Sequence, residues 1–386
     1  MSAAGRTIQQ MGSVTGGTDD VPEQVLLARA RAGDEGAFGV LIIPYLRELH
    51  VHCYRMLGSV HDAEDVLQEV LMRAWRHLDS FDGRGSVRGW LYRIATNRCL
   101  TARSRAAAAP AVALGPAPPP PNAPEVEVTA LAPYPDDWLR ELTGSGDPAV
   151  GYEVRESVQL AFLTVIQLLP PRQRAVLLLR DVLGFSTAET AQILRSTQAT
   201  VTSALQRARV TLDTHRASGR LRKTQAPDPV AERALADRFT AAWHASDIPA
   251  LVSALAEDCL LTMPPAPLAY RGREAIAAFF ATVPASGDLT AIRLILVRAN
   301  GQPAVAAYVR DGVMARAYGI MVLTVCDGII SEITGFADPS LFPLFGLPQL
   351  ADWPPRQADS PHRRNPWLTT RTWPTGSGPP SRPPRR

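Results

Sequence analysis

The chain has 386 residues, of which 46% are hydrophobic, and a formal net charge of only +3. Domains usually hold about 100–200 residues, so this length predicts about two to four domains rather than one. The apolar stretches are far shorter than the roughly 20 residues that cross a bilayer, and residues 1–20 lack the apolar core of a secretory signal, so we expect a cytoplasmic protein without a membrane span.

The cysteines are widely scattered along the sequence. They show neither Cys-x-x-Cys spacing nor a cluster with histidine, so we expect no zinc site and no disulfide framework. Buried, reduced thiols are the simpler interpretation, and we expect no metal and no cofactor. The four residues are Cys53, Cys99, Cys259 and Cys326.

Composition divides the chain into seven segments. Proline-rich and small-residue stretches separate three blocks that have the apolar periodicity of folded structure. We expect a disordered N-terminus (1–20), a helical block (21–105), an Ala/Pro-rich linker (106–146), a second helical block (147–216), a connector (217–228), an α+β block (229–348) and a disordered Pro/Arg-rich tail (349–386).

The first helical block carries clear helix-start signals. Asp34 is expected to cap a helix that runs to Leu57, a second helix begins near Asp62, and Ser86 caps a third. From Arg84 to Arg105 there are six arginines and no acidic residue. Aromatic residues among arginines suit unstacked single strands of nucleic acid, although Trp90 in this segment is equally explained as a core residue.

The second helical block predicts a helix-turn-helix. Its last two helices, Ser186–Leu194 and Thr197–His215, have the right size and spacing, and they follow helices at Tyr152–Leu169 and Pro171–Leu183. Opposite the apolar stripe, the final helix carries polar and basic residues that could reach base edges; an ordinary solvated face is the alternative. This face holds Thr202, Ser203, Gln206, Arg207 and Arg209.

The third block changes from helices to strands. Helices are expected at Ala231–Ala245, Ile248–Ala256 and Arg273–Ala281. Turn signals at Asn300-Gly301, Asp311-Gly312 and Asp327-Gly328 predict an antiparallel meander. The expected strands are Cys259–Met263, Thr290–Arg298, Ala304–Arg310, Ala315–Cys326 and Ile329–Phe336.

Two of these blocks carry motifs of a known family. The segment 48–105, with DAEDVLQE, DGRG and IATNRC, resembles the second conserved domain of extracytoplasmic-function sigma factors, and 168–212 is similar to their fourth conserved domain. PYPDDWL at 133–139 and the third block look like the subgroup with a fused SnoaL-like domain of the NTF2-like fold. The resemblance implies a multidomain protein: two all-α sigma domains, the second with a helix-turn-helix, followed by an α+β NTF2-like cone domain.

The resemblance also implies partners and site residues. The partners are core RNA polymerase, through its β′ clamp and β flap, and promoter DNA. The glycines at 85 and 89 depart from relatives that often carry side chains there, which leaves the −10 preference open. The implied sites are Asp65, Gln68 and Glu69 for the clamp; Asp82, Gly83, Arg84, Arg88 and Asn97 for the −10 element; and Thr202, Ser203, Gln206 and Arg207 for the −35 element.

The third block leaves its own function open. NTF2-like cones often hold a small ligand or an acid/base pair, and we expect a regulatory domain without catalysis that leaves room for a small ligand, because His244 is its only histidine. We also expect it to dock on the sigma core near the −35-reading module and to brace the core, with Tyr134, Trp138 and Leu139 in the contact. Residues that could line its cavity are Trp243, Asp258, Tyr270, Arg310 and Asp338.

Two alternatives come from other functional classes. One is an NTF2-like isomerase or hydrolase tethered to DNA, which would turn over a small molecule. The other is a repressor that uses the helix-turn-helix without polymerase. A repressor needs neither the acidic helix around Asp65 nor the arginine-rich segment after Arg84, so these features favour the sigma factor.

Overall fold

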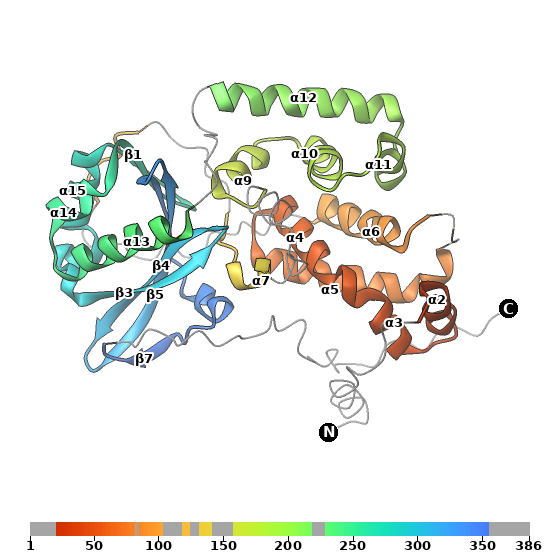
Figure 1. Cartoon of the computed structure of the whole chain (residues 1–386), viewed down its shortest axis with the longest axis horizontal. Coiled ribbons are helices and arrows are strands. Elements are labelled where there is room, and N and C mark those ends of the chain that lie inside the picture. Colours follow the sequence, from red (N-terminus) through yellow and green to blue (C-terminus); the bar gives the residue numbers. More distant parts are fainter. Residues whose placement is uncertain are drawn as a thin grey trace.

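The computed structural model describes residues 21–81, 83, 85–102, 118–123, 131–140, 157–217 and 228–354. They form a first helical module (21–102), a second helical module (157–217) and an α+β fused domain (228–354), and residues 103–156 are the linker between the helical modules. Figure 1 shows the fused domain on one side of the molecule and the two helical modules packed together on the other, with helix α12 along their outer edge.

Two helices of the first helical module begin at the predicted caps, Asp34 and Ser86. The helix expected near Asp62 begins two residues earlier, at Val60, and α2 was not predicted. The side chains of Asp34, Ser59 and Ser86 each accept a hydrogen bond from a backbone N–H in the first turn of the following helix. The predicted continuous helix to Leu57 is wrong: it breaks at a 3₁₀ turn around Pro44, whose ring removes a backbone donor. The elements are α2 (Glu23–Arg31), α3 (Glu35–Ile42), η1 (Ile43–Tyr45), α4 (Leu46–Leu57), α5 (Val60–Arg76), η2 (Leu78–Ser80) and α6 (Val87–Thr101).

The aromatic residues of the arginine-rich segment are core residues. Trp90 is 5% exposed and its ring lies 5.6 Å from that of Phe81. Tyr92 is fully buried. The simpler interpretation of Trp90 is therefore confirmed, and these rings cannot stack on bases in this arrangement.

The second helical module contains the predicted helix-turn-helix. Ser186 and Glu189 form a reciprocal capping box at the start of α11, and Arg195 ends that helix in the left-handed conformation (φ 50°), which turns the chain into α12. The expected helix from Tyr152 is described only from Leu160, since 151–156 lie outside the described residues. The elements are α9 (Leu160–Gln167), α10 (Pro171–Leu177), the π-helical turn η3 (Leu178–Val182), α11 (Thr187–Leu194) and α12 (Gln198–Ala217).

The fused domain is built on one sheet. Strands β3 to β6 form the predicted antiparallel meander, and β1 joins it parallel to β6, in the order β2-β1-β6-β5-β4-β3. The Asn300-Gly301 turn has positive φ at both residues (57° and 73°), as a two-residue hairpin requires. The elements are α13 (Pro229–His244), α14 (Ile248–Ser253), β1 (Leu255–Met263), β2 (Ala266–Arg271), α15 (Arg273–Thr282), η4 (Pro284–Gly287), η5 (Leu289–Ala291), β3 (Ile292–Ala299), β4 (Gln302–Asp311), β5 (Met314–Cys326), β6 (Ile329–Phe336), η6 (Pro339–Phe345) and β7 (Leu350–Asp352).

Two strands were missed by the sequence analysis. β2 follows Pro264 and Pro265, and β7 is only three residues long and pairs with the start of β5. The tail therefore does not begin at 349, because the described chain continues to 354 and the guanidinium of Arg310 lies 5.8 Å from the centre of the Trp353 ring.

The sheet buries both of its faces. Side chains on one face, including Val305 and Leu323, pack with α13, α14 and α15 into a core of the domain's own. Side chains on the other face, including Ile320 and Val322, join η6 in an apolar cluster that continues into both helical modules. The sheet therefore packs on the helices of the fused domain with one face and joins the apolar core of the two helical modules with the other.

Gly319 on β5 lies where the backbones of β5 and β6 come too close together for a larger side chain. A Cβ at this position would lie 2.3 Å from the carbonyl oxygen of Phe336, so Gly319→Ala should destabilise the fused domain by about 1–3 kcal/mol. Gly39→Ala in α3 is the control, since its Cβ meets nothing within 4 Å and alanine should stabilise that helix by about 0.5–1 kcal/mol. Urea unfolding of both variants measures the effects; an unchanged midpoint for Gly319→Ala would contradict this packing.

Candidate functional site

The polar face of α12 is open to solvent. Thr202, Ser203, Gln206 and Arg207 are all exposed, while Val201 and Ala208 on the opposite side are buried. Arg209, one residue further, is instead committed to Asp181 through hydrogen bonds of 2.9 and 2.7 Å. The four predicted −35 residues therefore share one accessible helix face.

Helix α5 carries the residues predicted to meet polymerase. Asp65 is exposed, and Gln68 and Glu69 are partly buried on the same side of the helix. Glu69 forms an ion pair with Arg98 of α6. Met72, one turn further along this side, is 37% exposed and adds an apolar surface that the sequence analysis did not single out.

The residues predicted to read the −10 element are only partly described. Asp82 and Arg84 lie outside the described residues, and Gly83 is exposed with a φ of 73°. Arg88 and Asn97 lie where the first helical module meets the second. Arg88 pairs with Glu48 at 3.0 Å.

The second helical module covers part of this site. The guanidinium of Arg88 lies 4.7 Å from the ring centre of Phe185, and the rings of Tyr92 and Phe185 are 5.2 Å apart. The side-chain amide of Asn97 donates to the carbonyl of Ile193 at the end of α11 (3.3 Å). Both residues are thus engaged by contacts within the protein.

Arg174 joins the two helical modules from their interior. It is 9% exposed, and its guanidinium donates to the carbonyls of Ile166, Gln167 and Leu169 around the end of α9 and to Met56 near the end of α4. Burial lowers its pKa to about 10, which leaves it charged at neutral pH. A cation suits the negative ends of helix dipoles, so Arg174 stabilises the meeting point of α4, α9 and α10.

Asn300, in the β3–β4 turn, connects the fused domain to three other segments. Its buried side-chain amide donates to the hydroxyl of Tyr54 (2.8 Å) in α4 and to the carbonyl of Val158 (2.6 Å) before α9. Its Oδ1 accepts from the backbone N–H of Tyr134 (2.8 Å) in the linker. We call this meeting point the Asn300 junction.

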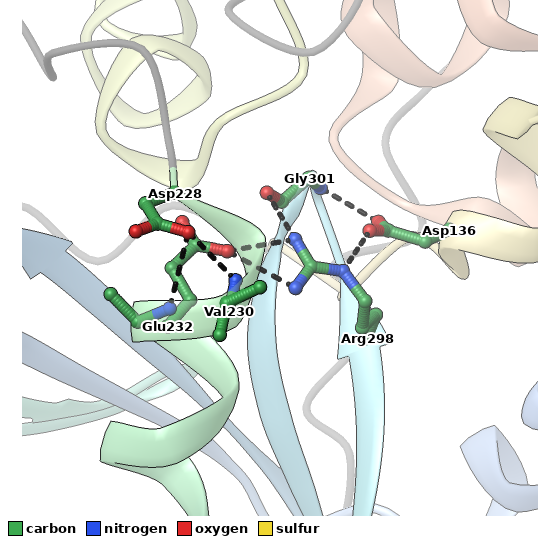
Figure 2. Close-up of polar contacts among 7 residues, drawn as sticks. Asp136, Asp228, Val230, Glu232, Arg298 and Gly301 are labelled. Atoms are coloured by element: carbon green, nitrogen blue, oxygen red, sulfur yellow. Dashed lines mark hydrogen bonds and ion pairs between the residues drawn. The ribbon is translucent and has the colours of Figure 1, made fainter.

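An ion-pair network lies beside the Asn300 junction (Figure 2). Arg298 donates to Asp136 of the linker and to Glu232 of α13, each at 3.1 Å, and to the carbonyl of Gly301 (3.0 Å). The other carboxylate oxygen of Asp136 accepts from the backbone N–H of Gly301 at 2.7 Å. Asp228 caps α13, which places Glu232 one turn into that helix and toward Arg298.

The expected contact through residues 133–139 is confirmed. Tyr134, Trp138 and Leu139 are at most 3% exposed, and α7 (Asp136–Arg140) begins in this segment. The hydroxyl of Tyr134 bonds to Nδ1 of His50 at 2.8 Å. The domain contacts the second module, which carries the helix-turn-helix, through the bond from Asn300 to Val158, as expected, and it leaves the polar face of α12 exposed.

The fused domain contains a small apolar cavity of about 50 Å³. Trp243 lines it as expected, but the four other expected residues are elsewhere: Asp258 is exposed, Tyr270 bonds to Pro119, Arg310 stacks on Trp353 and Asp338 caps η6. His244 accepts a hydrogen bond from the N–H of Leu294 (3.0 Å), and burial together with Arg293 lowers its pKa. Residues around the cavity include Leu261, Met263, Phe279, Phe280, Tyr318 and Ile333.

Comparison with known proteins matches each folded part. The model of Sigma-70 region 2 matches residues 41–109, that of Sigma-70 region 4 matches 159–212, and that of the SnoaL-like domain matches 236–333. The ECF RNA polymerase sigma factor SigG of Mycobacterium tuberculosis (strain ATCC 25618 / H37Rv) is 42% identical over 320 residues, which are 81% of this chain and 84% of that protein. The chain belongs to the ECF RNA polymerase sigma factors.

Other relatives of this sigma factor agree with that assignment. The ECF RNA polymerase sigma-E factor of Escherichia coli (strain K12) is 33% identical over 196 residues, covering 51% of this chain and 95% of that protein. The crystal structure of the Mycobacterium tuberculosis extracytoplasmic-function sigma factor SigJ shares the fold: its TM-score is 0.51 at 24% identity, over 80% of this chain and 99% of that one.

Two features are absent from the described residues. No helix within them combines the length and apolarity that a bilayer crossing requires. The same part of the chain contains no group of three or more His, Cys, Asp or Glu side chains arranged to hold a metal ion.

Two buried histidines of α4 make the sigma factor sensitive to acid. Burial lowers the pKa of His50 to about 4, and burial with Arg55 nearby lowers that of His52 to about 3. Both are neutral in the folded protein, whereas a histidine in the unfolded chain takes up its proton below about pH 6.5. The free energy of unfolding should therefore fall as the pH drops from about 6.5 toward 4, by at most ~1.4 kcal/mol per pH unit for each histidine.

His50→Gln should remove one histidine's share of this slope, measured by urea unfolding at several pH values between 7 and 4.5. His61→Gln, at an exposed position on α5, is the matched control and should keep the slope of the parent. Equal slopes for all three proteins would show that His50 is not buried as a neutral side chain.

Proposed function

We propose that α12 of this sigma factor reads the −35 element, that the loop at 82–85 with Arg88 and Asn97 reads the −10 element, and that α5 docks on the β′ clamp of core RNA polymerase. The observation that carries the proposal is the polar face of α12, which is exposed on the second helix of a helix-turn-helix. Promoter-specific transcription initiation is the function of the family. We propose in addition that the second helical module contacts the β flap of the polymerase.

The closed packing of the helical modules bears on how initiation proceeds. Reading both elements at once requires the modules to lie about 25 base pairs apart, roughly 85 Å along B-form DNA. In this structure α6 and α11 are in direct contact. The modules must therefore separate, and that movement would release Arg88 and Asn97 for the −10 element.

We further propose that the fused domain modulates this opening through the Asn300 junction and binds a small apolar ligand without turning it over. The cavity walls are apolar side chains, apart from the indole N–H of Trp243 and the hydroxyl of Tyr318, whose pKa is raised by burial. The indole N–H is buried and has no hydrogen-bond partner among the described residues, so a ligand with one acceptor atom would satisfy it. Acid/base catalysis needs a proton-transfer pair, and a regulatory site does not.

Docking on polymerase is tested by reversing one charge on α5. Asp65→Arg should abolish co-purification with core enzyme, because it places a cation where the proposed interface needs an anion. Glu64→Arg makes the same charge change about 100° around the helix and should leave co-purification intact. Normal core binding by Asp65→Arg would remove this residue from the interface, and strong promoter binding by the parent without core enzyme would favour the repressor alternative.

Promoter reading is tested with neighbouring arginines of α12. Arg207→Ala should relax base preference at one position of the −35 element, since a good base contact contributes about 1–3 kcal/mol of discrimination. Arg209→Ala loses an exposed pair with Asp181 and should keep the base preference. Transcription from a library of −35 variants gives the readout. If Arg207→Ala weakens all sequences equally, Arg207 contacts a phosphate instead.

A further inference from the structure

The fused domain holds the linker of the two helical modules at two places. The first is the described segment 118–123, which runs beside the edge strand β2. The side-chain amide of Asn122 donates to the carbonyl of Arg271 (2.9 Å) and accepts from its backbone N–H (2.7 Å). The hydroxyl of Tyr270 donates to the carbonyl of Pro119 at 2.8 Å.

The second place is the segment 131–140. Tyr134 exchanges two hydrogen bonds with Asn300, one to its side chain and one from its backbone N–H, both of 2.8 Å. Asp136 accepts from Gly301 and Arg298. The same segment is bonded to the first helical module, since Tyr54 donates to the carbonyl of Ala132 at 2.8 Å.

We call these two bound segments, 118–123 and 131–140, the anchors. They shorten the free chain between the two helical modules and so reduce the distance by which the modules can separate. Without them, residues 103–156 join the modules and can span at most about 200 Å. With them, the second module is connected to the anchored body by 141–156, which spans at most about 60 Å, and by 218–227, which spans at most about 40 Å from Ala217 to Asp228. The connector 218–227 is the shorter of the two connections, so it limits how far the second module can move away.

The largest separation of the two reading sites that the connector 218–227 permits is close to the distance between the −10 and −35 elements. The reading face of α12 lies 10 to 15 residues before Ala217, or about 15–23 Å along the helix, so it can lie at most about 60 Å from Asp228. Asp228 is beside the Asn300 junction, and α6, which packs on α4 on the side away from the fused domain (Figure 1), is about 22 Å long with its 15 residues. The sum is about the 85 Å between the two elements.

We propose that the fused domain, by anchoring the linker, sets the longest −10 to −35 spacing that this sigma factor accepts. The proposal rests on the promoter-reading roles given above. Once 118–123 and 131–140 are bound, residues 103–117 no longer add to the distance that the two modules can reach. The connector 218–227 then limits how far the second module can move from the fused domain.

The test inserts ten Gly/Ser residues into the full chain at two alternative places. Insertion within 218–227 should extend the accepted spacer by several base pairs, up to about 6, at which point 141–156 becomes limiting. The same insertion within 106–117 should leave the spacer profile of the parent unchanged. Transcription with core polymerase from promoters lengthened one base pair at a time provides the profile.

A third protein tests the anchors themselves. Combining Asn122→Ala and Tyr270→Phe with Asn300→Ala and Asp136→Ala removes the side-chain hydrogen bonds of both anchors. This protein should accept a longer spacer without any insertion, because the linker is then released from the fused domain. Identical spacer profiles for the parent and for the 218–227 insertion would overturn the proposal, as would equal effects of the two insertions. In those cases transcription at the parental spacing still reports on promoter reading, so failure of the tether and failure of the proposed function are distinguishable.

Discussion

The side-chain amide of Asn300 bonds to all three segments that meet the fused domain at its β3–β4 turn: α4, the linker and the start of the second helical module. It is completely buried, and a buried amide that loses a partner costs about 1–3 kcal/mol. Its three partners come from segments that are far apart in the chain, and each satisfies a different donor or acceptor site. The positions of the other parts follow from this requirement, because moving any one of them leaves a polar group unpaired in an apolar cluster.

The Arg298 network constrains the orientation of the fused domain at the Asn300 junction. Its carboxylate partners Asp136 and Glu232 are almost fully buried, while the guanidinium is about a third exposed, so the charges lie at the edge of the interface. A planar guanidinium can bond to two carboxylates and a carbonyl at once only in one orientation. Glu232 and Gly301 hold Arg298 within the fused domain, so its bond to Asp136 orients that domain relative to the linker, whereas the amide of Asn300 fixes the contact point.

Local structure was predictable from the sequence because its causes are local. Ser59, Ser86 and Ser186 cap helices by bonding to backbone within three residues, and the turn at Asn300-Gly301 follows from the conformations that Asn and Gly tolerate. The junction was not predictable, because Tyr54 and Asn300 are 246 positions apart and nothing in a turn sequence indicates where its side chain points. The apolar PYPDDWL segment was the one usable signal, since a linker in water has no reason to contain Tyr134 and Trp138.

The predicted site residues divide in the same way. The exposed face of α12 follows from helix periodicity, which the sequence displays. The covering of Arg88 and Asn97 depends on Phe185 and Ile193, which belong to another module. Two of the residues wrongly proposed for the cavity likewise have partners in distant segments, since Tyr270 bonds to Pro119 of the linker and Arg310 lies on Trp353. Contacts between modules depend on their arrangement in space, and periodicity within one module carries no information about it.

The bonding of Arg174 has a consequence for how ionic strength acts on this protein. Its described partners are carbonyl oxygens at the ends of buried helices, and dissolved ions screen such short, desolvated contacts far less than exposed ones. Contacts to DNA phosphates behave oppositely, since their affinity falls steeply as salt rises. Concentrated salt should accordingly leave the contact between the modules intact while it weakens their binding to the promoter, so a rise in ionic strength favours the closed arrangement.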